Sequence, residues 1–155
     1  MKYSELRSSQ RIDLCKEIPL DIPLTLYIEL TNICNFRCHF CPESFTDFHK
    51  ISGGKFKLDY SIYSEVINEL SENGGIKTLN FYMMGEPFVN KEITKFISYA
   101  KQKSVAEKLI VTTNGSLIKE NIYESICTSL LDYLRVSIYG FNEENQNQKS
   151  IMKQR

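Results

Sequence analysis

The 155-residue sequence has no excess of charge of either sign and no cluster of basic residues. It contains 19 Lys and Arg residues and 19 Asp and Glu residues, so its formal net charge is zero. Proteins that hold duplex nucleic acid mainly through its phosphates need clustered Lys and Arg side chains. The composition therefore argues against duplex nucleic acid as a partner, and it favours a small molecule or a peptide.

Long hydrophobic runs are also missing. The first ten residues contain no apolar stretch typical of a signal peptide, and no run approaches the roughly 18 apolar residues of a membrane span. We therefore expect a cytoplasmic protein without a membrane partner. Hydrophobic residues make up 42% of the chain, which is enough to form one core and excludes wholesale disorder.

The cysteines are few, and their number is odd. They are Cys15, Cys34, Cys38, Cys41 and Cys127. An odd number argues against a framework of disulfides, and three of the five lie within the eight residues 34–41. In a reducing compartment such a group indicates metal ligation, because its thiols are not consumed by disulfides.

The hydrophobic periodicity predicts strands that alternate with helices. Strands are expected at residues 24–30, 77–84, 109–113 and 134–139, and apolar stripes of helical spacing run over 62–70, 93–100 and 117–130. Asp59 precedes the first helix, Gly74 and Gly75 end it, and Asn90 is the predicted N-cap of the second. The order βαβαβαβ predicts a parallel sheet with right-handed crossovers.

The predicted strands have one aliphatic and one polar face. The aliphatic face carries residues such as Leu79, Phe81 and Met83 in the second strand and Leu134, Val136 and Ile138 in the fourth. The polar face carries Tyr27, Glu29, Asn80, Tyr82, Arg135 and Tyr139. We expect helices on the aliphatic face and a functional space on the polar one, such as the inside of an incomplete barrel. A polar face simply open to solvent is the alternative.

Cys34, Cys38 and Cys41 form a C-x3-C-x2-C motif directly after the first predicted strand. Three thiolates leave one iron of a [4Fe-4S] cluster without a protein ligand, so that this iron can bind a substrate or cofactor. A zinc site with His39 or Cys127 as fourth ligand is the alternative, although structural zinc usually uses two separated ligand pairs. We expect an exposed His39, and ordinary thiols at Cys15 and Cys127.

The cysteine motif resembles that of the radical S-adenosylmethionine (SAM) enzyme superfamily. The match includes Phe40 just before the third cysteine, the preceding IELTN and the following CPES, and it covers about residues 22–141. It is similar above all to the branch that carries extra cysteine-rich C-terminal domains and modifies peptides, sugars or cofactors. The resemblance implies an α/β fold of parallel βα repeats in a partial (β/α)6 TIM-like barrel. About four strands and three helices of that barrel are present here.

Three further segments resemble the same family. Residues 84–87, Met-Gly-Glu-Pro, stand where the family has Gly-Gly-Glu-Pro, and Met84 departs from that pattern. The resemblance implies that Gly85, Glu86 and Pro87 bind the methionyl end of SAM, with Glu86 on its amino group. Asn114 and Ser137 lie in segments 112–115 and 136–140, which are similar to the family's cofactor-facing strand ends, and Phe40 would pack beside the adenine. Each segment alone could be an ordinary turn or strand, but they fall at successive strand ends.

The resemblance also implies the chemistry. Cys34, Cys38 and Cys41 would bind a [4Fe-4S] cluster that reductively cleaves SAM to a 5'-deoxyadenosyl radical, and this radical abstracts hydrogen from a substrate. A low-potential electron donor such as flavodoxin or ferredoxin would supply the electron. The substrate and any catalytic residue are not indicated. The alternative is a non-catalytic iron–sulfur or zinc-binding module.

The expected organisation is an N-terminal extension over 1–21, the family core over 22–141 and a polar tail over 142–155. The family core resembles a barrel of six β/α units, and only four strands are predicted here. We therefore expect the N-terminal part of a longer enzyme, or a truncated copy, which would be a poor catalyst alone.

Overall fold

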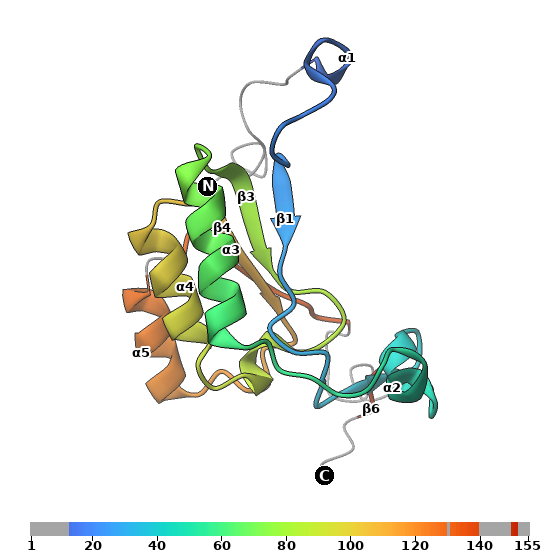
Figure 1. Cartoon of the computed structure of the whole chain (residues 1–155). Helices are drawn as coiled ribbons and strands as arrows, with labels where there is room; N and C mark the ends of the chain where they lie inside the picture. The colour runs from blue at the N-terminus through green and yellow to red at the C-terminus, as the bar shows by residue number, and fades with distance from the viewer. Residues whose placement is uncertain (1–12, 130, 140–149, 152–155) are drawn as a thin grey trace.

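The computed structural model of the chain describes residues 13–129, 131–139 and 150–151 (Figure 1). Its main sheet is formed by the parallel strands β1 (Thr25–Tyr27), β3 (Ile76–Phe81), β4 (Ala106–Thr113) and β5 (Tyr133–Val136), side by side in that order. Helices α3 (Tyr60–Glu72), α4 (Ile93–Gln102) and α5 (Glu120–Thr128) connect successive strands. The predicted βαβαβαβ order and the α/β class are confirmed.

The boundaries of α3 follow local signals, whereas the predicted start of α4 does not hold. The Asp59 side chain accepts a hydrogen bond from the amide of Ser61 and caps α3, and Gly74 and Gly75 end it at φ values of 95° and 76°. The prediction of Asn90 as the next N-cap is wrong. A short 3₁₀ helix, η3 (Pro87–Val89), precedes Asn90, and α4 begins at Ile93 with Glu92 as its N-cap.

The third helical stripe is only partly helix. Leu117 and Ile118 come before α5, although both pack against the core. The stripe's last member, Leu130, lies outside the described residues. Apolar spacing thus identified Leu117 and Ile118 as core residues, but it placed the start of the helix too early.

All three long helices cover the same face of the sheet (Figure 1). The side chains of Leu79, Phe81, Leu109 and Val111 are fully buried beneath them. The Tyr63 hydroxyl on α3 donates to the Phe96 carbonyl on α4 at 2.6 Å, so the two helices are joined inside the core. The predicted aliphatic face is therefore confirmed for β3 and β4.

The ends of the strands depart from that pattern. Met83 was predicted on the aliphatic face, but it follows the end of β3 and is 64% exposed. Leu134 and Val136 of β5 were also predicted on the aliphatic face and are exposed. In the described part of the chain, β5 pairs with β4 alone and forms an edge of the sheet.

The chain between β1 and α3 leaves the sheet. Residues 31–58, which we call the cysteine lobe, extend beyond the carboxyl ends of the strands (Figure 1). The lobe contains β2 (Arg37–Cys38), the 3₁₀ helix η2 (Pro42–Ser44) and α2 (Phe48–Ile51), and β2 pairs antiparallel with β6 (Ser150–Ile151).

The N-terminal side of the sheet carries a small separate element. The short helix α1 (Leu14–Glu17) stands apart from the sheet (Figure 1).

Among the described residues, no helix combines the length and apolar character needed to cross a membrane. The boundaries after residues 21 and 141 stay predictions.

Candidate metal and cofactor site

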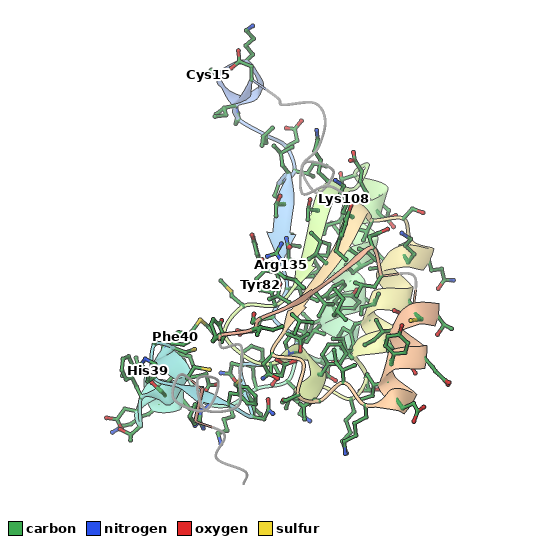
Figure 2. All side chains as sticks on the ribbon, turned by 180° about the vertical axis from the view of Figure 1, so that it is seen from behind. Cys15, His39, Phe40, Tyr82, Lys108 and Arg135 are labelled. Atoms are coloured by element: carbon green, nitrogen blue, oxygen red, sulfur yellow. The ribbon has the colours of Figure 1, made fainter. Side chains whose placement is uncertain are left out.

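The three cysteines of the motif share one loop of the cysteine lobe. Cys34, Cys38 and Cys41 are all partly buried. The Cys41 amide donates to the Cys38 carbonyl at 2.8 Å, which makes a tight turn between these two residues. The exposed Cys15 and Cys127 lie elsewhere, on α1 and α5, and Figure 2 shows Cys15 far from the lobe.

The thiols of this loop influence one another. Burial raises the pKa of Cys34 to about 11, and the charges of Glu86, Glu43 and Cys38 act in the same direction. Burial and the neighbouring Cys41 likewise raise the pKa of Cys38. Such thiols stay protonated at neutral pH, and a bound metal would reverse this by displacing their protons.

The donor set suits a cluster better than a single ion. All three donors are thiols, and the Phe36 amide donates to the Cys34 sulfur at 3.4 Å, the kind of contact that tunes iron–sulfur clusters. Among the described residues, no three His, Cys, Asp or Glu side chains converge on the position of a single metal ion. A cubane cluster binds each thiolate through a different iron, so its ligands do not need to converge on one point.

A buried ion pair holds the loop around Cys38 and Cys41. Arg37 donates through Nη1 to the Glu43 carboxylate and, at 2.7 Å, to the Glu43 carbonyl. The Glu43 side chain is only 1% exposed, and Nε2 of His49 lies 3.4 Å from its Oε2. The contact closes the loop from residue 37 to residue 43. The sequence interpretation included Glu43 only within the CPES segment and gave it no role, because nothing in its spacing distinguishes it from a surface carboxylate.

The Met-Gly-Glu-Pro turn is fixed against the start of the cysteine lobe. A Cβ atom at Gly85 would lie 2.0 Å from the Thr31 carbonyl oxygen, so this position admits only glycine. The amides of Met84 and Gly85 donate to Oε1 of Glu29 at 2.6 and 2.9 Å. Met84 is not among the described residues with positive φ, so its backbone does not require the glycine that the family has there.

Glu86 lies inside the protein and links two strand ends. Its Oε1 accepts from the Thr113 hydroxyl at 2.6 Å and from the Phe88 amide at 3.2 Å, and its Oε2 accepts from the Asn114 amide at 2.8 Å. Burial raises the pKa of Glu86, although these three hydrogen bonds lower it in part. A carboxylate accepts about four hydrogen bonds, so one position on Oε2 remains for a further donor.

A second link connects the lobe to the turn after β4. The Asn114 side-chain amide donates to Oδ1 of Asn35 at 3.0 Å, and the Asn35 amide donates to the Ser116 hydroxyl at 2.9 Å. The sequence interpretation missed Asn35 and Thr113 as partners of this network. The only sequence signal for these two residues was that Asn35 follows Cys34 and Thr113 precedes Asn114. The sequence interpretation placed Glu29 on the polar face but gave it no role.

The remaining predicted cofactor residues also lie at the carboxyl edge of the sheet. Phe40 is half-exposed, and its ring centroid lies 4.7 Å from that of Tyr139. The Ser137 amide donates to the Thr113 carbonyl at 2.8 Å and thus continues the pairing of β5 with β4. Pro87 is buried at the start of η3. The structure therefore brings Glu86, Asn114 and Ser137 together around Thr113.

The amino ends of the strands, opposite the cysteine lobe, form a hollow without a cluster of metal-binding side chains. A hollow of about 490 Å³ lies there, lined by Leu24, Gly75 and Lys77 among others. It is separated from the cysteines by the length of the strands, and its lining offers no cluster of metal ligands. Ligands of parallel α/β sheets bind at the carboxyl ends of the strands, so we place the candidate site there.

Comparisons with known proteins identify the family to which the chain belongs. The sequence model of the Radical SAM superfamily matches residues 28–155. The chain is 30% identical over 129 residues to the S-adenosylmethionine-dependent nucleotide dehydratase RSAD2 of Danio rerio, a match that covers 81% of this chain and 33% of the relative. The chain belongs to the radical SAM superfamily, whose members are enzymes.

Two solved structures share the fold. BtrN in complex with AdoMet and 2-DOIA superposes with a TM-score of 0.65 at 22% identity, over 74% of this chain and 45% of BtrN. Streptococcus suis SuiB bound to its precursor peptide SuiA gives a TM-score of 0.65 at 20% identity, over 88% of this chain and 29% of SuiB. The chain thus has the fold of part of a TIM-like barrel, and it spans about a third of the length of the dehydratase.

Proposed function

We propose that this chain is the cofactor-binding part of a radical SAM enzyme, in which a bound [4Fe-4S] cluster reductively cleaves SAM to a 5'-deoxyadenosyl radical that abstracts hydrogen from a substrate. The observation that carries this proposal is the arrangement of Cys34, Cys38 and Cys41 on one partly buried loop. Three separate segments that match the family then meet beside this loop. We propose residues 22–141 as the family core in this chain.

The chain's own residues have distinct roles in this proposal. Cys34, Cys38 and Cys41 hold the cluster, and the Arg37–Glu43 ion pair keeps their loop closed. Gly85 and Pro87 shape the turn that receives the methionyl end of SAM. Because Glu86 already accepts three hydrogen bonds, it offers the SAM ammonium only the remaining position on Oε2.

The other end of SAM would lie across the following strand ends. Phe40 is exposed enough to pack against the adenine. Asn114 would face the cofactor, and Ser137 would contact its ribose or carboxylate. A low-potential donor of the flavodoxin or ferredoxin class would supply the electron. The named relatives act on a nucleotide or bind a precursor peptide, so we propose a small molecule or a peptide as substrate.

Anaerobic reconstitution with iron and sulfide tests the proposal. We expect a brown protein with thiolate-to-iron charge-transfer absorption and about four irons per chain, as a [4Fe-4S] cluster requires. Replacing Cys34, Cys38 or Cys41 by Ala should remove the iron in each case. Cys15→Ala and Cys127→Ala are the matched controls and should keep it, because these thiols lie on α1 and α5.

The same preparation distinguishes a radical SAM enzyme from the alternative, a non-catalytic metal-binding module. Stoichiometric zinc without iron, or iron content that is equal in all five variants, would contradict the cluster. If the cluster loads, added SAM should perturb its electron paramagnetic resonance spectrum after reduction. An unchanged spectrum would leave an iron–sulfur module that does not bind SAM.

A further inference from the structure

The polar face of the sheet carries a row of side chains that the cofactor site does not use. The strand register pairs Thr112 on β4 with Arg135 on β5, and continuing the β3–β4 pairing by one residue places Tyr82 beside Thr112. Because Val111 points into the helix-covered core, Thr112 points to the opposite face. Figure 2 shows Tyr82 and Arg135 next to each other. We call Tyr82, Thr112 and Arg135 the donor row.

The Tyr82 hydroxyl oxygen accepts a hydrogen bond from Nη1 of Arg135 at 3.3 Å. Tyr27 lies beside it: the two rings meet edge to face at 5.5 Å, and interaction with Tyr82 raises the pKa of Tyr27. The hydrogen bond with Arg135 uses an acceptor position of Tyr82 and leaves its proton for another partner.

The other two members of the row also offer donors. The Thr112 hydroxyl oxygen is buried, and no described group is its hydrogen-bond partner. Arg135 is exposed and carries five N–H donors, and no ion pair is described for it within residues 13–139. Because its side chain is long and exposed, the guanidinium can move to admit a ligand to the Thr112 hydroxyl.

The described carboxylates near the row have other partners. Oε1 of Glu29 accepts from the amides of Met84 and Gly85. Asp132 on the neighbouring turn accepts from Lys101 at 3.0 Å. The donor row thus combines a cation with two hydroxyls, and no described hydrogen bond or ion pair joins Arg135 or the Thr112 hydroxyl to a carboxylate. The complement of such a group is a negatively charged group rich in oxygen.

We infer that the donor row recognises an oxyanion of the substrate, a carboxylate or a phosphoryl group, through the guanidinium of Arg135 and the hydroxyls of Tyr82 and Thr112. The inference rests on the proposed function, because it takes the polar face as the wall of the substrate space. The row lies beside the Met84–Gly85 turn on the same face, which is where a substrate would approach the SAM site.

The test is an NMR titration of the full 155-residue chain without iron or SAM. The Nε–Hε signal of Arg135, assigned with Arg135→Gln, is followed while inorganic phosphate or acetate is added at constant ionic strength. We expect a saturable shift with at least one of the two probes, and the stronger probe identifies the oxyanion class. Chloride at the same ionic strength should cause no saturable shift.

Isosteric variants examine the individual donors. Thr112→Val and Tyr82→Phe each remove only a hydroxyl, and each should weaken binding by roughly three- to thirtyfold, the usual effect of one hydrogen bond to a charged group. Thr112→Ser keeps the hydroxyl and should bind as the wild type does. Lys108→Gln removes a cation from the amino end of the same face and should leave binding unchanged (Figure 2).

Three outcomes would overturn the inference. The first is an equal shift with chloride, and the second is a loss of binding in Lys108→Gln as large as that in Thr112→Val. The third is displacement of the probe by S-adenosylhomocysteine, since the row would then serve the cofactor's carboxylate. Because the titration needs no cluster, failure of iron loading leaves its result intact, and failure of oxyanion binding leaves the cluster proposal intact.

Discussion

The helix-covered sheet and the cysteine lobe are stabilised in different ways. Under the helices the buried side chains are aromatic or aliphatic, as with Phe81, Phe96 and Ile97. In the lobe, which is described over its whole length, the buried side chains are Thr31, Asn32, Phe36 and Glu43. Apolar burial stabilises the sheet without regard to direction, whereas the lobe depends on oriented hydrogen bonds and one ion pair.

This difference indicates how the stability of each region depends on a bound metal. A region with few buried apolar contacts opens at a lower free energy than the global unfolding of the protein. Such a region gains stability from any ligand that binds only its folded form. We therefore expect the sheet to fold independently of metal, and the lobe to become rigid when metal binds.

The largest effect is expected from a cavity in the sheet region. Phe96→Ala removes a buried ring that packs against Tyr63 at 4.7 Å, and it should lower the free energy of unfolding by about 3–5 kcal/mol. Urea denaturation measures this change. The control Ile62→Ala alters an exposed side chain of α3 and should cost much less. The independence of the two regions would be contradicted if folded Phe96→Ala protein lost its capacity to load iron.

A large chemical effect is expected in the lobe. Burial raises the pKa of the Cys34 thiol from an ordinary 9.0 to about 11, so at pH 8 its reactive thiolate is about a hundredfold scarcer than that of an ordinary thiol. Alkylation by iodoacetamide should therefore be about ten- to hundredfold slower at Cys34 than at the exposed Cys15. Mass spectrometry of quenched samples measures both rates. Equal alkylation rates would show that Cys34 is exposed to solvent in the metal-free protein.

The smallest effect is expected where the two regions meet, at Glu86. Burial raises its pKa in the folded protein, so between its unfolded and folded pKa values the folded state binds more protons. Its contribution to stability is present below the unfolded pKa and is lost as the pH rises through the folded pKa. Relative to Glu86→Gln, the wild type should become less stable across this window, as urea denaturation at a series of pH values would show. A parallel pH dependence of the two proteins would exclude a raised pKa.

The sequence predicted the sheet region well, because its elements depend on periodic burial. The alternation in residues 77–84 is confirmed within β3 for Leu79 and Phe81 but not for Met83, and the stripe in residues 93–100 correctly identified the buried face of α4. The errors lie at the ends of elements. Asn90 has the chemistry of an N-cap, but Pro87 starts a 3₁₀ helix first and delays α4 to Ile93.

The residues of the candidate site could be predicted only where they belong to a sequence motif. The spacing identified the cysteines, but it could not reveal that Glu43 is buried against Arg37, since that pairing depends on how the loop folds back. Likewise, the resemblance assigned Glu86 to a ligand, and the structure adds its internal partners Thr113 and Asn114. Contacts between segments distant in sequence leave no local pattern.

The contact between Gly85 and Thr31 sets a limit on how this chain can vary. A side chain at position 85 would displace a backbone carbonyl that begins the cysteine lobe, and no rotamer can avoid this because the clash occurs at Cβ. The neighbouring position 84 already carries methionine without strain. In a saturation mutagenesis library, position 84 should therefore accept many residues, whereas position 85 should accept only glycine. Two adjacent positions of one turn would then differ entirely in the sequence variation that they permit.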